Sequence, residues 1–518
     1  ATEAQQALRA IPAELANVAL RNGLEAKAPG RVKAGMINAL AQRRDTGSLP
    51  QLLVMCSDTD PTLAEAAIAA IGQIGGPEAE SALQGLSPPA ALKHTWDEAL
   101  LACATTAIKA ERRDVATAIC RALIASGETD STKLGACREL VRLRGIEALP
   151  QILQLIKTAQ GDAQRIAAKT AAEIPGEATA GRMASALPEL PASVQAVVIR
   201  ALADRGDKQA APIVADLLSS PEAVIRLAAI DALATLGGAA QVKPLIALAL
   251  TEGPQAGKAA HALAVLPGAG AENVMLETLP TSENAALRKL LVQTLSARHH
   301  QPAVPLLIQR AATDPDAAVR RECLKAIRVL GSSEQVGKLL NLMTTCTQPR
   351  DLEEARRTVE TLAQSIPAAE RDVLLLKAWN ASGEEARPAI GGLMGTLGGK
   401  AAERALIAGL GDEEEAVRYA AVKALGEWST PTPADSLLEF AKTTQNEVHH
   451  VLAMRAFVRL VGMITSGDTK NRYEAAIAVA RRPQEKEMLK SAMMGLTVTN
   501  LKAGSGKPYE LLSKGFRL

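Results

Sequence analysis

Aromatic residues are scarce in this sequence, which has three Trp, three Tyr and three Phe among 518 residues. Sheet-rich folds rely on aromatic and β-branched side chains, so the scarcity argues against them. Hydrophobic residues still make up 47% of the chain, and most of them are Ala, Leu, Val and Ile, which let helices pack closely. Because the chain is too long for one ordinary core, we expect several domains or a helical array that grows in one dimension.

Excess charge of one sign is also missing. The sequence has 58 Lys and Arg against 56 Asp and Glu, a formal net charge of +2. No global field therefore draws the protein to nucleic acid or to an anionic membrane, and any electrostatic recognition must be local. An apolar run of about 18 residues is lacking as well, so we predict no membrane-spanning segment.

The cysteines lack the pairing typical of metal sites and disulfide frameworks. The six of them form no C-x-x-C pair, so we expect free and mostly buried thiols. The chain begins ATEAQQALRA, with no Met and no recognisable leader. Localisation is therefore unknown, because a cytoplasmic protein and an exported mature form without its signal peptide both fit.

A recurrent segment is what the sequence does contain. Residues 312–331 read ATDPDAAVRRECLKAIRVLG, and residues 219–238 and 411–428 repeat the same order of acidic turn, apolar residue with Arg, and Ala-rich helix. The apolar residue near the end of that helix recurs about every 33 residues from Leu40 to Leu496, a period that indicates a solenoid. A second apolar stripe follows, so each unit is predicted to be a helical hairpin that is stable only when stacked on its neighbours.

This pattern resembles the HEAT-repeat family, in its short bacterial variety, over nearly the whole chain. The resemblance implies an all-α, right-handed α-solenoid, or superhelix, of about fifteen helical hairpins. We expect residues 1–468 to form the repeat array and residues 469–518 a basic, less regular capping repeat continuous with it.

In the family, acidic residues and arginines at the turns commonly form a ladder between neighbouring repeats. Such pairs cap helices and set the stacking register. The unit at residues 95–126 lacks the apolar-Arg step, which leaves the continuity of the ladder open there. The positions that match the ladder are Glu222, Arg226, Arg288, Asp314, Asp316, Arg320, Asp412 and Arg418.

No arrangement of residues in the sequence indicates catalysis or metal binding. The adjacent pairs His299–His300 and His449–His450 point about 100° apart on a helix, so we predict turn and helix-start residues rather than zinc ligands. The segment LKAGSGKP at 501–508 lacks the first glycine and the hydroxyl residue of a phosphate-binding loop. Some HEAT-like proteins are enzymes, but the repeated His-Glu dipeptides of deoxyhypusine hydroxylases are absent here. We predict no catalytic residue, no metal and no cofactor.

Three glycines repeat at four-residue spacing, at Gly391, Gly395 and Gly399. Within a helix each would cost about 1 kcal/mol relative to Ala, so the face they share must serve close approach. Two interpretations remain, tight packing on a neighbouring repeat and a docking groove for a partner.

Aromatic and basic residues gather toward the end of the chain. Every aromatic residue except Trp96 lies beyond residue 378, and residues 469–518 hold ten Lys and Arg against four Glu. The cluster indicates either a partner surface or bulkier core residues with a polar cap. On the first interpretation the partner-binding candidates are Trp379, Tyr419, Trp428, Tyr473, Arg481 and Arg482.

The sequence therefore predicts a non-catalytic scaffold that binds another protein, which it does not identify. Nucleic acid is not an expected partner, and a small molecule is left open. The alternatives are a nucleic-acid-binding HEAT-like solenoid, suggested by the basic end, and a HEAT-like accessory to a lyase or other enzyme, suggested by the resemblance to phycobilin lyases.

Overall fold

The computed structural model describes residues 14–85, 87–88, 90–268, 270–464 and 469–499, without the side chains of 496–499. These residues form α-helices joined by short turns and 3₁₀ segments, and no strand occurs among them. The predicted all-α class is confirmed. No helix of the described part combines the length and the apolar character needed to cross a membrane.

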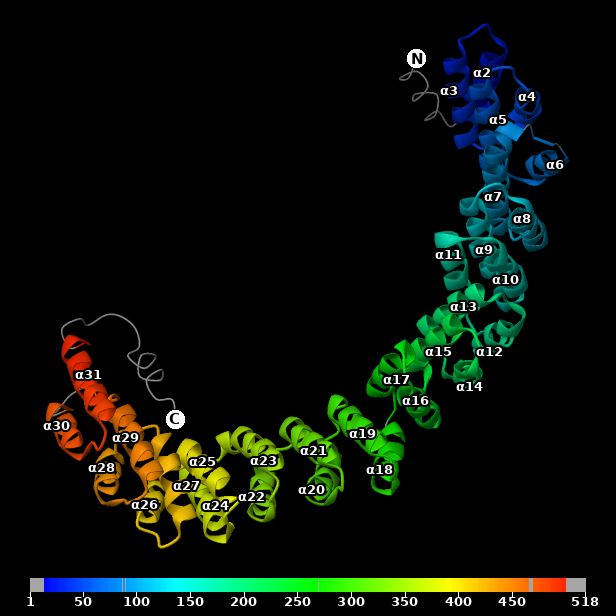
Figure 1. Ribbon diagram of the computed structural model, residues 1–518. Coiled ribbons are helices and arrows are strands. Elements are labelled where there is room, and N and C mark those ends of the chain that lie inside the picture. The colour runs from blue at the N-terminus through cyan, green and yellow to red at the C-terminus, as the bar shows by residue number, and fades with distance from the viewer. Residues whose placement is uncertain (1–13, 86, 89, 269, 465–468, 500–518) are drawn as a thin grey trace. The chain divides into compact units, whose positions relative to one another are not determined.

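The chain divides into two compact units, Ala1–Ala271 and Glu272–Leu518. Within each unit the helices alternate between two layers along the sequence (Figure 1). The division falls inside the predicted repeat array, and the predicted boundary at residue 468 stays a prediction.

The first layer holds the Ala-rich helix of each hairpin. In the first unit it consists of α3 (Gly30–Gln42), α5 (Pro61–Ile74), α7 (Lys93–Lys109), α9 (Asp130–Arg144), α11 (Gly161–Ala172), α13 (Ala192–Arg205), α15 (Ala223–Leu236) and α17 (Pro254–Val265). In the second unit it consists of α19 (Ala285–Ala297), α21 (Ala317–Leu330), α23 (Pro349–Leu362), α25 (Arg387–Leu397), α27 (Glu415–Gly426), α29 (Glu447–Val461) and α31 (Pro483–Thr499).

The second layer returns the chain to the start of the next hairpin. Its helices in the first unit are α2 (Glu14–Glu25), α4 (Leu49–Met55), α6 (Pro77–Gly85), α8 (Arg113–Ser126), α10 (Leu149–Thr158), α12 (Ala178–Ser185), α14 (Ala211–Asp216) and α16 (Val242–Ala249). Helix α18 (Gly270–Thr281) contains the boundary, and α20 (Val304–Thr313), α22 (Val336–Thr345), α24 (Ala368–Ala381), α26 (Lys400–Gly409), α28 (Ala434–Thr443) and α30 (Thr469–Val479) belong to the second unit.

Local sequence signals begin and end these helices. Asp60 precedes α5, where its side chain accepts a hydrogen bond from the Thr62 N–H, and Pro61 takes the first helical position, where no N–H is needed. The helix stops at Gly75, whose φ of 64° is a conformation that glycine adopts without strain. The turn chemistry read from the sequence therefore explains where the hairpins bend.

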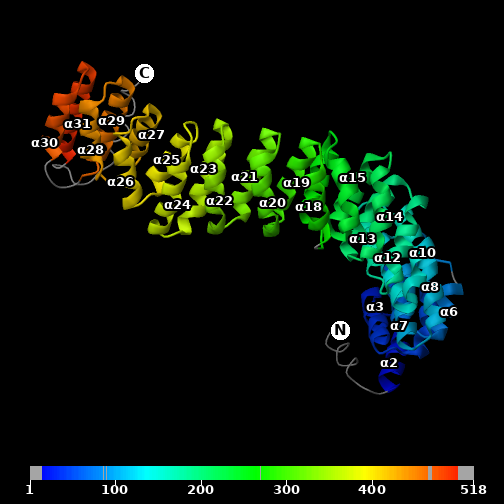
Figure 2. The same cartoon turned by 90° about the horizontal axis from the view of Figure 1, so that it is seen from below.

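The core lies between the layers and between stacked hairpins. Most of the recurring apolar residues are fully buried, including Leu40, Ile71, Leu233 and Ile327, whereas Ile108 and Val141 are partly exposed. Successive first-layer helices such as α19, α21, α23 and α25 contact one another in a row, which Figure 2 shows from below. Each hairpin covers the apolar face of its neighbour, as a repeat array requires.

Candidate functional site

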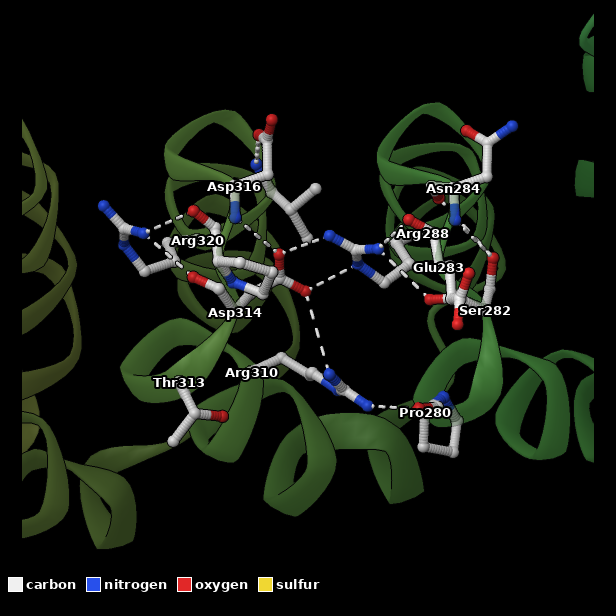
Figure 3. Close-up of polar contacts among 12 residues, drawn as sticks. Pro280, Ser282, Glu283, Asn284, Arg288, Arg310, Thr313, Asp314, Asp316 and Arg320 are labelled. Atoms are coloured by element: carbon white, nitrogen blue, oxygen red, sulfur yellow. Dashed lines mark hydrogen bonds and ion pairs between the residues drawn. The ribbon is translucent and has the colours of Figure 1, made fainter.

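A buried carboxylate in the second unit joins successive repeats. Asp314, in the turn between α20 and α21, is 2% exposed. Its Oδ2 and Oδ1 accept hydrogen bonds from Nε and Nη2 of Arg288 on α19, each at 2.8 Å (Figure 3). The Asp316 N–H donates to Oδ1 at 3.0 Å, and Nη1 of Arg310 lies 3.9 Å from Oδ2. This bidentate, charge-assisted pair supplies the partners that a buried ion needs.

Arg288 also closes the turn that precedes its own helix. Its Nη1 donates to the carbonyls of Ser282 at 3.1 Å and Glu283 at 2.8 Å, while the Asn284 side chain caps α19 (Figure 3). The hydrogen bonds to Asp314 raise the pKa of Arg288 above its ordinary value. One guanidinium thus holds both its own turn and the next repeat.

The other predicted arginines repeat the turn-closing contact but differ in their reach. Arg226 and Arg418 each donate from Nη1 to the carbonyls five and six residues earlier, at 2.6 to 2.8 Å. Arg320 donates to the corresponding carbonyls at 2.8 and 3.4 Å, and it also reaches forward to Asp351, with Nε 2.7 Å from Oδ2. Arg226 meets the amide oxygen of Gln255 at 3.4 Å instead of a carboxylate, and within the described residues Arg418 donates only to its own turn.

Three predicted acidic residues form no hydrogen bond or ion pair to another repeat within the described residues, and two of them bond to their own turns. The Asp316 carboxylate accepts from the N–H groups of Ala318 and Val319, and the Val319 hydrogen bond lowers the pKa of Asp316. The Asp412 carboxylate accepts from the Glu414 N–H, and the Glu222 side chain does not cap α15. A short side chain beside a helix start lies within reach of that helix's free N–H groups, so it pairs locally.

Two buried aspartates connect repeats in a different way. Asp97 on α7 is fully buried, and its Oδ2 accepts from the Glu128 N–H in the following turn at 2.8 Å. Asp372 on α24 accepts from the N–H groups of Gly399 at 2.6 Å and Ala401 at 2.9 Å, at the start of α26. In the unit at 95–126, which lacks the apolar-Arg step, a carboxylate-to-backbone contact therefore joins that unit to the next.

A second set of arginines lies at the C-terminal ends of the first-layer helices and contacts the preceding repeat. These arginines were not identified from the sequence. Nε of Arg298 lies 2.7 Å from Oε1 of Glu272, and Nη2 of Arg144 lies 2.7 Å from Oδ1 of Asp114. Burial alone would raise the pKa of Glu272, but the Arg298 hydrogen bond and charge hold it below its ordinary value. The sequence signal is a basic residue in the last turn of a first-layer helix or just after it, which recurs in many repeats. The members of this set are Arg112, Arg144, Arg205, Arg298 and Arg459.

The last described repeat is joined to its neighbour by a buried histidine and glutamate. His450 on α29 is fully buried, with Nδ1 2.9 Å from the Ala441 carbonyl oxygen and Nε2 3.3 Å from Oε2 of Glu485 on α31. Oε2 also accepts from the N–H groups of Arg481 at 3.0 Å and Arg482 at 3.3 Å. Both ring nitrogens therefore lie against oxygen atoms of neighbouring helices.

Three of the four aromatic partner-binding candidates are core residues. Trp379, Trp428 and Tyr473 are 7%, 4% and 1% exposed, so a partner could not reach most of their surface. Their burial corrects the prediction of surface anchors: the wide rings fill space between stacked helices, as Tyr473 does against Phe457. Tyr419 is half-buried and lies against the ring of His449.

The basic candidates Arg481 and Arg482 pair with an acidic residue of the preceding repeat. Their guanidinium groups lie 2.8 Å and 3.4 Å from the carboxylate of Glu447 at the start of α29. Arg472 likewise lies 2.7 Å from Asp435 on α28. Much of the described basic charge is therefore engaged in holding the last hairpin, and a partner-binding role for Arg481 and Arg482 stays a proposal.

The glycines of α25 pack against the next repeat. A Cβ on Gly395 would lie 2.5 Å from the Ala424 carbonyl oxygen of α27, and one on Gly391 would lie 3.4 Å from the Ala420 carbonyl oxygen of the same helix. Gly391 also faces Trp379 of the preceding helix α24, with Cζ3 at 3.1 Å from such a Cβ. Both glycines are buried, so the face serves close packing and offers no docking groove there. The prediction was wrong for Gly399, because α25 ends at Leu397 and Gly399 precedes α26.

The cysteines and histidines form no cluster suited to a metal. Among the described residues no group of three or more His, Cys, Asp or Glu side chains is placed to hold an ion. All six cysteines are free, as predicted, and only Cys346 is not fully buried. Burial raises the pKa of Cys323 to about 12, which disfavours the thiolate a nucleophile requires.

The fold defined by these features is an α-solenoid of stacked helical hairpins tied by polar ladders. The profile of HEAT repeats matches residues 17–100, 182–264, 272–360 and 373–455. The chain belongs to the HEAT-repeat family, as its turn and helix pattern indicated.

Solved structures with similar folds are distant in sequence. A mutant of Kap121p is 10% identical, with 94% of this chain and 67% of that chain covered and a TM-score of 0.40. Importin beta is 12% identical, with 94% and 78% covered and a TM-score of 0.34. The CpcE–CpcF complex of phycocyanin lyase from Nostoc is 15% identical, with 55% and 94% covered and a TM-score of 0.22. No curated protein matches the sequence.

Proposed function

We propose that this protein is a non-catalytic scaffold whose first-layer helices present an extended surface to another protein. The observation that supports the proposal is how the buried polar groups are used. Asp97, Asp314, Asp372, His450 and Glu485 are buried, and each bonds to a turn, helix or side chain of an adjacent repeat. These buried ionisable side chains thus hold stacked repeats together. A partner protein would then contact the outer faces of the helices.

Affinity capture with the full chain, followed by mass spectrometry, tests this proposal. We expect a specific protein to be retained from the native source, and its binding to the purified chain to be reproduced with that protein alone. Turnover of a substrate by the purified chain, or retention of nucleic acid instead of protein, would contradict it.

The proposed contribution of the basic end is tested with the same assay. Charge reversal at Arg482, which is half exposed, should weaken capture if this end meets the partner. A truncation before Thr469 is less informative, because it would strip Glu485 from the buried His450.

A further inference from the structure

A row of basic side chains follows one face of the first-layer helices in the first unit. Helices α9, α11 and α13 bury equivalent positions 31 residues apart, which sets their mutual register. These buried triplets are Ala136, Ala167 and Val198, and Leu140, Ala171 and Leu202. In the same register Arg138, Lys169 and Arg200 occupy one position in three successive repeats, and all three are exposed.

The charge of this row is largely uncompensated. The Arg138 and Arg200 side chains form no ion pair within the described residues, and Lys169 has a weak pair with Glu173, the residue after its own helix, at 3.9 Å. The row of basic residues does not continue into the repeats before α9 and after α13. The same position is held by Thr105 on α7 and by Asp231 on α15, and Asp231 pairs with Lys258 at 2.6 Å.

A groove lined by both apolar and charged side chains runs beside the row between α11 and α13. Ile166 and Val197 lie one turn before Lys169 and Arg200, and the small residues Ala168 and Ala201 leave room beneath them. The groove has a volume of about 480 Å³, enough for a large side chain with part of its backbone. Arg165 at its wall is paired with Asp162. Lys169 and Arg200 supply positive charge to the groove, and Asp204 in the lining offsets it in part.

The spacing of the row determines which ligand fits. Stacked helices lie about 8 to 10 Å apart. A peptide in the extended polyproline II conformation rises about 3.1 Å per residue with three residues per turn, so every third side chain lies on the same side and meets a successive repeat. We propose that this surface binds an extended segment of the partner protein that carries an acidic side chain at every third residue and seats an apolar side chain on Ile166 and Val197. The inference rests on the proposed function and adds the place and the chemistry of recognition. Asp231 limits the segment to three acidic positions, because a fourth would meet the Asp231–Lys258 ion pair in place of an available cation.

Synthetic peptides test the spacing directly. The probe is a short, labelled peptide of repeated Glu-Leu-Ser units, and its controls have the same composition with the Glu residues consecutive, or Lys in place of Glu. Fluorescence anisotropy with the full chain should show binding of the periodic peptide about tenfold tighter than either control, weakening as salt is added. Equal binding of the periodic and consecutive peptides, or binding to none, would overturn the proposal.

Charge-reversal variants locate the binding. Lys169→Glu with Arg200→Glu should weaken the periodic peptide about tenfold or more. The matched control, Lys109→Glu with Lys289→Glu, makes the same change of net charge at exposed positions of α7 and α19 and should leave affinity within about twofold. Ile166→Ser should also weaken binding, because the side chain is 37% exposed at the groove. Equal losses in the two double variants would mean non-specific attraction and would refute the site.

The failure of this inference can be told apart from the failure of the proposed function. If the native partner is retained by wild-type chain and equally by the Lys169→Glu, Arg200→Glu variant, the scaffold function stands and this groove is not its site. If no protein partner is retained at all, the scaffold function fails, whatever the peptides show.

Discussion

At the scale of single residues, Asp314 shows how one carboxylate can set the position of a whole repeat. It accepts from Arg288 of the preceding hairpin and from the backbone of its own turn, and it is almost fully buried. A buried ion pair adds little net stability compared with apolar residues, but removing one partner leaves an uncompensated charge. Removing one partner of the pair should therefore cost more stability than the intact pair adds.

Asp314→Ala should destabilise the second unit by about 3 to 5 kcal/mol, because Arg288 would remain buried without its carboxylate. Denaturant unfolding of the full chain would measure the change. The matched control is Asp231→Ala, which removes an inter-repeat ion pair that is about half exposed and should cost less than about 1 kcal/mol. Similar losses for the two variants would show that burial does not decide the value of these pairs.

His449 predicts a dependence of stability on pH. Burial lowers the pKa of His449, Arg418 lowers it further and Glu415 opposes the shift. The unfolded chain therefore takes up a proton below about pH 6.5 that the folded chain resists. Stability is fully present above that pH and falls as the pH drops toward the folded value.

Thermal unfolding of wild type and His449→Leu between pH 8 and pH 5 checks this sign. Leucine keeps an apolar group between Tyr419 and Phe440, whose rings lie 6.1 Å and 6.0 Å from the imidazole. The wild type should lose more stability on acidification than the variant. A parallel fall in both proteins would assign the pH dependence to other groups.

At the scale of the element, α25 shows that glycines in one helix have different roles. Gly395 faces the backbone of α27, whereas the nearest atom to a Cβ on Gly392 would be Cδ of Arg356, at 3.9 Å. Gly395 is needed because it lets the two helices approach closely. Gly392 lowers the helix propensity of α25 without allowing such an approach.

Gly395→Ala should destabilise the protein by about 1 to 3 kcal/mol, since α25 and α27 would have to separate. Gly392→Ala, three residues away on the same helix, should stabilise it by up to about 1 kcal/mol. Denaturation midpoints of the two variants, measured together, provide the comparison. A loss of stability in both would mean that the solvent-facing side of α25 is as crowded as its packed side.

At the scale of the whole molecule, each unit is a row of repeats in which neighbours contact one another, so a local change should have a local effect. Glu485 and His450 join α31 to α29, and Glu485 is 1% exposed. In a one-dimensional array the loss of such a contact weakens the adjoining hairpins and leaves remote ones unchanged.

Glu485→Ala should therefore increase backbone hydrogen exchange in α29, α30 and α31 and leave exchange in α3 to α9 as in wild type. Mass spectrometry of exchanged peptides resolves these segments. Exchange that rises throughout the chain would contradict the picture of independent, nearest-neighbour stacking.

The sequence by itself determined the helical hairpins, their period and the family, because amphipathic stripes and turn signals act within a few residues. It also indicated that Arg288 and Asp314 lie at turns where repeats meet. Only the tertiary structure decided that Asp314 pairs with Arg288 whereas Asp316 caps its own helix, that Trp379 and Trp428 are buried, and that Arg138, Lys169 and Arg200 form one exposed row. Those outcomes depend on distances across the stack, which are set by packing between helices and not by the order of residues along one of them.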